Sequence, residues 1–173
     1  MKNKKLLNKG FTLLELLVVV VIIGILAGIA LPQYRRAVDK SRFSTLMDIT
    51  RAIAEANERF YLANDRYSTN FAELDIDIPA NSINAYEHKA YFDWGYCYLN
   101  TQQQVQCLNN TTLNNKFIIH YSLGTHELYS NHILCAALTN EANSRYDKVC
   151  QNVGQFWTTE TCAEGPCRIY KIR

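Results

Sequence analysis

The sequence has little glycine and little proline, 7 and 3 residues among 173. This scarcity excludes collagen-like chains and low-complexity Pro/Gly segments. With 48% hydrophobic and 20% charged residues, the composition also excludes a disordered chain and a protein with many membrane spans. The sequence has no H-E-x-x-H pattern, nucleophile elbow or phosphate loop, so we expect no metal, no cofactor and no enzyme activity. The four histidines lack paired-ligand spacing and are expected on the surface or in strands: His88, His120, His126 and His132.

Acidic residues are missing from the first ten positions, where four lysines lie. The whole chain carries a net charge of +2, whereas without those lysines 14 basic residues face 16 acidic ones. The basic excess therefore belongs to the N-terminus alone. The remaining charge of −2 argues against nucleic acid as a partner without excluding it.

Residues 11–31 are almost wholly apolar and would span ~31 Å as a helix, about one bilayer core. The lysines before them predict a cytoplasmic N-terminus and an exported remainder. A cleaved secretory signal or a plain single-pass anchor would also have this pattern. Neither explains Glu15, the one ionisable side chain between Phe11 and Pro32, because a carboxylate at membrane depth is costly and is usually functional.

A second helical stretch follows, because residues 33–63 contain neither glycine nor proline. Apolar side chains recur at spacings of three and four, which predicts one buried stripe: Leu46, Ile49, Ile53, Ala56 and Phe60. Charged side chains fall on the opposite, solvated face: Asp48, Arg51, Glu55 and Arg59. The pattern predicts a membrane helix that continues as an amphipathic helix.

Small residues and one proline interrupt the apolar stretch. Gly24 and Gly28 have the G-x-x-x-G spacing that allows close approach of another membrane helix, although glycine is also simply frequent in such helices. Pro32 has no N–H and leaves the Gly28 carbonyl without its helical partner. We therefore expect the segment containing Gly24, Gly28 and Pro32 to be a weak point of the helix.

The remainder is expected to be an irregular loop over residues 64–90 and β-structure over residues 91–173. Alternating apolar residues and turn signals predict strands within these ranges: 91–99, 104–108, 116–122, 127–138 and 168–172. The fold class is thus α+β, with a long N-terminal helix packed on a C-terminal antiparallel sheet.

All six cysteines lie after residue 96, which favours disulfides in an exported domain over a zinc site. Six cysteines allow about 15 pairings, and sequence alone does not choose among them. Proximity along the chain favours Cys97–Cys107, Cys135–Cys150 and Cys162–Cys167.

The segment from Lys9 to Glu15, K-G-F-T-L-L-E, resembles the class III signal of type IV pilins and secretion pseudopilins. The resemblance implies that a membrane-embedded prepilin peptidase cleaves between Gly10 and Phe11 and that the new Phe11 amine is methylated. It also implies that Glu15 docks against the Phe11 amine of a neighbouring subunit. Leu14 stands where the family commonly has isoleucine. The similarity is specific as far as residue 38.

This resemblance gives each stretch an expected role. Residues 1–10 would be a cleaved leader, 11–31 the transmembrane and assembly helix, and 32–63 its amphipathic half. Residues 64–90 would be the loop between helix and sheet, and 91–173 a disulfide-stapled globular region.

The implied function is that of a structural subunit, which polymerises through its N-terminal helix into a type IV pilus. The implied partners are identical and related pilin subunits, the prepilin peptidase, an inner-membrane platform, a cytoplasmic ATPase and the lipid bilayer. The subunit would wait in the inner membrane and end in an extracellular filament. Two alternatives stay open: a pseudopilin of a type II secretion system, with a periplasmic pseudopilus, and a minor pilin that acts as an adhesive or DNA-uptake module.

Overall fold

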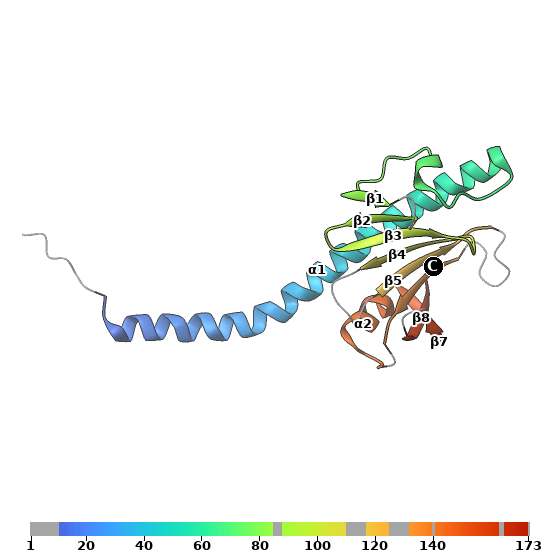
Figure 1. Cartoon of the computed structure of the whole chain (residues 1–173). Helices are drawn as coiled ribbons and strands as arrows, with labels where there is room; N and C mark the ends of the chain where they lie inside the picture. Colours follow the sequence, from blue (N-terminus) through green and yellow to red (C-terminus); the bar gives the residue numbers. More distant parts are fainter. Residues whose placement is uncertain are drawn as a thin grey trace, which may run out of the picture. The chain divides into compact units, whose positions relative to one another are not determined.

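A computed structural model describes residues 11–84, 88–109, 117–124, 132–139, 141–162 and 165–172. The expected leader, residues 1–10, lies outside these ranges. The chain divides into two compact units, Met1–Val38 and Asp39–Arg173. Helix α1 (Leu13–Asn64) contributes to both of them (Figure 1).

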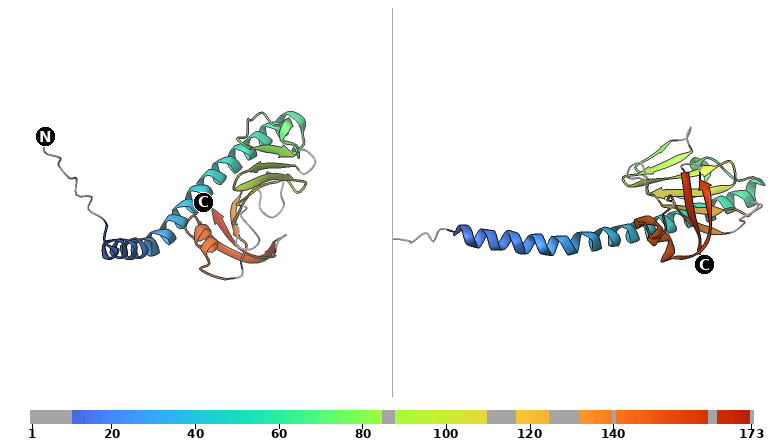
Figure 2. Two further views of the ribbon diagram at one scale, coloured as in Figure 1. Left: turned by 60° about the vertical axis from the view of Figure 1, so that its left-hand side comes forward. Right: turned by 90° about the horizontal axis from the view of Figure 1, so that it is seen from below.

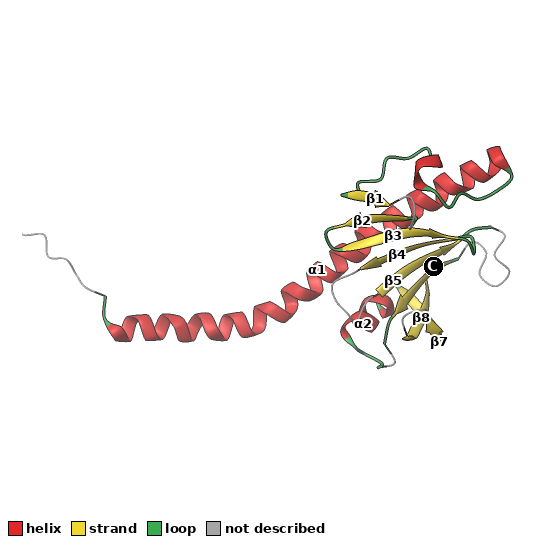
Figure 3. Cartoon of the chain, viewed as in Figure 1, coloured by secondary structure: helices red, strands yellow, loops and turns green. Residues whose placement is uncertain are grey.

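The described part of the first unit consists almost entirely of α1. Its apolar side chains are exposed, from Leu13 at 82% to Val18 at 47%. The helix continues through Pro32 without a break (Figure 3). In the part of the chain that the structure describes, α1 alone is long and apolar enough to cross a membrane. The prediction of one continuous helix from the apolar stretch into the amphipathic stretch is therefore confirmed.

The second unit contains one antiparallel sheet, which has eight strands within the described ranges. They run in the spatial order β1-β2-β3-β4-β5-β6-β8-β7 (Figure 1). Their bounds are β1 Ser82–Asn84, β2 Lys89–Phe92, β3 Gly95–Asn100, β4 Gln104–Asn109, β5 Phe117–Ser122, β6 Ile133–Ala137, β7 Gly154–Cys162 and β8 Gly165–Ile172. The expected α+β fold class is confirmed.

The part of α1 after Asp39 lies against this sheet (Figure 2). The predicted stripe forms the contact, since Leu46, Ile53 and Ala56 are fully buried. Phe43 adds a ring that lies 5.5 Å from the ring of Phe117 in β5. The charged side chains predicted for the other face are exposed, which confirms that assignment: Asp48, Arg51, Glu55 and Arg59.

The prediction of one strand over residues 91–99 was wrong, because β2 ends at Phe92 and β3 begins at Gly95. A Cβ atom at Gly95 would lie 2.2 Å from the Leu108 carbonyl oxygen, so only glycine permits this close approach of β3 to β4. The prediction of irregular structure over residues 64–90 was wrong in part. A 3₁₀-helix, η1 (Phe71–Glu73), and strand β1 lie within that stretch.

Two C-terminal elements were not predicted, α2 (Arg145–Gln151) and β7. Helix α2 has only two turns, too short for a clear period, and begins at the N-cap Ser144. Strand β7 is exposed on both faces, so its apolar residues do not alternate, although its Phe, Trp and Thr residues are typical of a strand. Strand β8 begins at Gly165, three residues before the predicted start. Lys116, residues 127–131 and His126 lie outside the described residues.

Candidate functional site

The N-terminus of α1 is built around Thr12 and Glu15. The Thr12 backbone N–H and hydroxyl both donate to Glu15 Oε2, at 2.8 and 2.7 Å. In return the Glu15 N–H donates to Thr12 Oγ1 at 3.2 Å. This is a capping box, in which a threonine before the helix and a glutamate three residues later satisfy each other. The T-x-x-E spacing carries this signal, but sequence analysis considered Glu15 only as a contact between subunits.

Phe11 precedes this cap and is 76% exposed. Gly10 lies outside the described residues, so cleavage between Gly10 and Phe11 remains a prediction. Docking of Glu15 against the Phe11 amine of a second subunit remains a prediction too. In the single chain, the carboxylate of Glu15 has Thr12 as its partner.

The surface of α1 around the two membrane glycines is open. A Cβ atom placed on Gly24 or Gly28 would have no atom within 4 Å, apart from the helix's own backbone. Large apolar side chains on all sides are about half exposed or more, including Ile22, Ile25 and Ile29. A surface this apolar requires lipid or other apolar helices around it. Helix α1 is unbroken from Gly24 through Pro32. The weak point predicted for this segment therefore stays a prediction.

Three disulfides staple the second unit, and all six cysteines are paired. Cys97–Cys107 joins directly opposed residues of β3 and β4, with a Cα–Cα distance of 4.0 Å. Cys135–Cys150 ties β6 to α2, and Cys162–Cys167 closes the β7–β8 hairpin. These are the pairs that proximity along the chain favours.

Two buried carboxylates fix α2, and neither was predicted from the sequence. Asp147 in α2 accepts hydrogen bonds from the Tyr170 hydroxyl at 2.5 Å, Arg168 Nε at 3.0 Å and Gln151 Nε2 at 2.9 Å. Burial raises the pKa of Tyr170, and its bond to Asp147 adds to this effect. The side chains that surround Asp147 therefore compensate for the burial of its charge.

Asp39 is the second buried carboxylate, and it joins α1 to α2. Arg145 donates to it from Nε at 2.5 Å and from Nη2 at 2.7 Å. The Asp39 side chain is only 2% exposed, whereas Arg145 is 44% exposed. Hydrogen bonding to Asp39 raises the pKa of the Arg145 guanidinium. The sequence gives no signal for a pair this far apart in the chain.

The C-terminal end of α1 is held to the following loop by a second set of contacts. The Asn57 side chain exchanges two hydrogen bonds with the Ser68 backbone, at 2.8 and 3.0 Å. The Tyr67 hydroxyl donates a hydrogen bond to Glu58 at 3.0 Å. Burial is the main cause that raises the pKa of Tyr67 to about 12, and the bond to Glu58 adds to it. The loop after α1 is therefore fixed against the helix.

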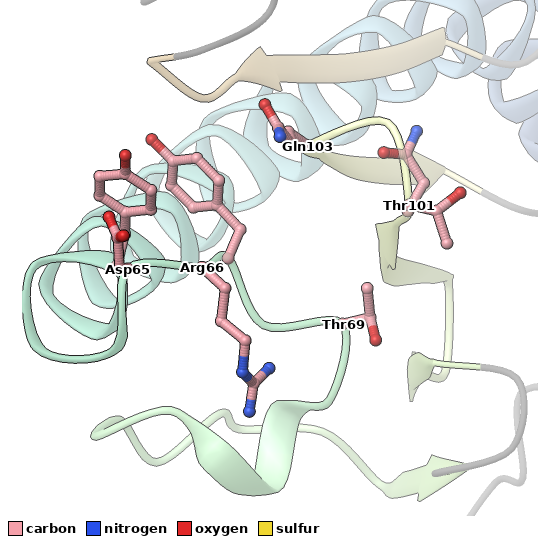
Figure 4. Close-up of a pocket in the computed structure, with 8 residues that line it drawn as sticks. Asp65, Arg66, Thr69, Thr101 and Gln103 are labelled. Carbon is pink, nitrogen blue, oxygen red and sulfur yellow. The ribbon is translucent and has the colours of Figure 1, made fainter.

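An open hollow of about 410 Å³ lies between this loop and the β3–β4 turn (Figure 4). Its lining is mostly polar and includes Asp65, Arg66, Thr69, Thr101 and Gln103. The Arg66 guanidinium donates a hydrogen bond to Glu73 and lies over the Phe60 ring. Among the described residues no group of histidine, cysteine and acidic side chains could hold a metal ion.

The N-terminal segment is similar to segments of known proteins. Residues 6–31 match the model described as the prokaryotic N-terminal methylation motif. The chain is similar to type IV pilins. It is 38% identical over 90 residues to the type IV major pilin protein PilA of Myxococcus xanthus, and 52% identical over 54 residues to the type IV major fimbrial protein FimA of Dichelobacter nodosus.

These similarities cover part of each protein. The two alignments span 52% and 31% of this chain, and 40% and 35% of the two relatives. The type II secretion system core protein G of Aeromonas hydrophila is also similar, with 36% identity over 90 residues, 51% of this chain and 62% of that protein. No solved structure matches the chain.

Proposed function

We propose that the chain is a structural subunit that polymerises through its N-terminal helix into a type IV pilus. The observation that carries this proposal is the N-terminal segment of α1, which is apolar, exposed and interrupted by a single carboxylate, Glu15. The match of residues 6–31 to the methylation motif and the similarity to type IV major pilins support it. On this proposal the role is structural rather than enzymatic.

Before assembly, the subunit waits in the inner membrane with its N-terminus on the cytoplasmic side. The prepilin peptidase cleaves between Gly10 and Phe11, and the new Phe11 amine is methylated. In this state Thr12 satisfies the Glu15 carboxylate, as the hydrogen bonds of the capping box allow. Thr12 thereby reduces the cost of placing the carboxylate at membrane depth.

During assembly, the positive Phe11 amine of a second subunit pairs with Glu15. Phe11 lies just before α1 and Glu15 within its first turn, so the pairing requires adjacent helices to be staggered along their axes. Pairing of the two charges relieves the burial cost of both. The open surface at Gly24 and Gly28 allows the helices of neighbouring subunits to approach closely. An assembly ATPase and a membrane platform would drive the process.

The yield of sheared filaments, relative to total membrane subunit, tests this proposal when the chain is the sole subunit. Glu15→Ala and Glu15→Gln should insert and fold but form few or no filaments, because neither side chain supplies the charge. Asp48→Asn is the matched control, since Asp48 is an exposed carboxylate on the same helix. Wild-type filament yield from Glu15→Ala would show that Glu15 is not the docking residue.

A pseudopilin of a type II secretion system is the second candidate. The similarity to the Aeromonas core protein G favours it, since that alignment covers a larger part of its relative. The location of the polymer separates the two candidates. A type IV pilin yields filaments that can be sheared from the cell surface, whereas a pseudopilin remains in the periplasm.

A further inference from the structure

Two adjacent arginines, Arg35 and Arg36, follow the apolar stretch of α1 closely. Both are exposed, and neither has an ion-pair or hydrogen-bond partner in the described part of the chain. Tyr34 precedes them and is 68% exposed. A tyrosine beside basic residues at the end of an apolar span is typical of a segment at the membrane–water interface.

The charge of this part of the sequence is not balanced by a free carboxylate. Lys40 and Arg42 follow within a few residues, and Asp39 is the one acidic residue between Pro32 and Met47. The Asp39 carboxylate is buried and bonded to Arg145. It is therefore unavailable to neutralise Arg35 or Arg36, and both guanidinium groups remain free to bind an anion.

We propose that Arg35 and Arg36 bind the phosphates of anionic phospholipid headgroups on the exported side of the membrane. This inference rests on the proposed insertion of residues 11–31 into the bilayer. Arg35 lies about 6 Å along the helix axis beyond Leu31, which places its guanidinium at headgroup level when the apolar stretch fills the hydrocarbon core. Arginine is suited to this role because its planar group donates two parallel hydrogen bonds to phosphate.

The consequence is an electrostatic anchor on the exported face of the unassembled subunit. The leader lysines would anchor the subunit on the cytoplasmic side of the membrane until the leader is cleaved. After that cleavage the arginines would still retain the subunit at a fixed depth. They must leave the headgroups when the subunit is drawn into a filament, so the anchor opposes extraction.

Lipid selectivity of the full chain in bilayers tests the proposal. Phosphatidylcholine bilayers are doped with spin-labelled phosphatidylglycerol or spin-labelled phosphatidylcholine, and electron paramagnetic resonance gives their relative association with the protein. The test variant is Arg35→Gln/Arg36→Gln. The control is Arg51→Gln/Lys148→Gln, which removes two exposed basic groups from elsewhere in the chain. The leader lysines are the same in all three proteins.

We expect the wild-type chain to prefer phosphatidylglycerol. Each basic group near an anionic surface contributes about fivefold, so the test variant should lose at least about fivefold of that preference. The control should keep it, and high salt should weaken it in the wild type. Equal preference in the wild type and the test variant would overturn the proposal. Because this measurement uses unassembled subunits, its outcome is independent of filament yield.

Discussion

Glu15 accepts two hydrogen bonds from Thr12 of its own chain, at 2.8 and 2.7 Å. The residue that we propose as the contact between subunits is therefore already satisfied within the single subunit. Thr12 and Glu15 should then have separable roles. Thr12 would keep the unassembled subunit in the membrane, and Glu15 would join subunits.

Replacement of Thr12 by valine tests this separation, because valine has the same shape but no hydroxyl. Thr12→Val should destabilise the start of α1 by about 1 kcal/mol, the usual cost of losing a helix cap, and so lower the amount of subunit in the membrane. The ratio of filament to membrane subunit should change little. Thr12→Ser keeps the hydroxyl and serves as the control. A Thr12→Val subunit with normal membrane abundance but few filaments would assign Thr12 to docking instead.

The Asp39–Arg145 pair predicts an asymmetric effect on stability. Arg145→Gln leaves a buried carboxylate without its partner and should cost about 3–5 kcal/mol of unfolding free energy. Asp39→Asn leaves Arg145 partly in water and should cost only about 1–2 kcal/mol. The double variant should lose about as much unfolding free energy as Asp39→Asn, because it no longer contains a buried carboxylate without a partner.

Thermal unfolding of the full chain in detergent measures these differences. The Arg59–Asp75 ion pair is the control, since both side chains are at least half exposed, and its loss should have no resolvable effect. Equal costs for Arg145→Gln and Asp39→Asn would mean that burial of the Asp39 carboxylate does not decide the stability of the pair.

His120 in β5 predicts a dependence of stability on pH. Its Nε2 atom is buried without a partner, and burial lowers the pKa of His120 to about 4. Because the unfolded chain keeps the ordinary pKa of about 6.5, it binds a proton more readily than the folded chain does between these values. Stability is therefore complete above about pH 6.5 and falls as the pH decreases toward 4.

We expect a loss of about 2 kcal/mol between about pH 7 and pH 5, which lowers the melting temperature by roughly 5–10 °C. His120→Gln should show a flatter profile over the same range. Carboxylates whose pKa is lowered, such as Glu73 and Asp75, titrate below this window and do not obscure it. An unchanged slope in His120→Gln would assign the effect to other groups.

The long helix and its buried face could be predicted from the sequence because their signals are local and periodic. Leu46, Ile53 and Ala56 repeat at helical spacing, and the same residues are buried against the sheet. Lys9 to Glu15 likewise form one contiguous segment. In that segment the T-x-x-E spacing is also typical of a capping box, and in the structure the Thr12 hydroxyl donates a hydrogen bond to Glu15.

The C-terminal half was harder to predict because its stabilising contacts join distant residues. Asp147 is fixed by Arg168 and Tyr170, and no periodic pattern connects those positions. Strand β7 lies at the edge of the sheet with both faces exposed, so hydrophobic alternation does not mark it. A turn at Asp93 and Trp94 divides the predicted strand, and the close approach of Gly95 to Leu108 that follows it is a tertiary contact.

The central claim is that this chain is processed at Phe11 and built into a filament. Mass spectrometry of the main subunit in filaments sheared from cells tests it most directly. The account predicts this chain as that subunit, with an N-terminal peptide that begins at Phe11 and carries one methyl group on its amine. A chain in the same cells that keeps Met1, or that begins at Leu31, and that is missing from sheared filaments would contradict the account.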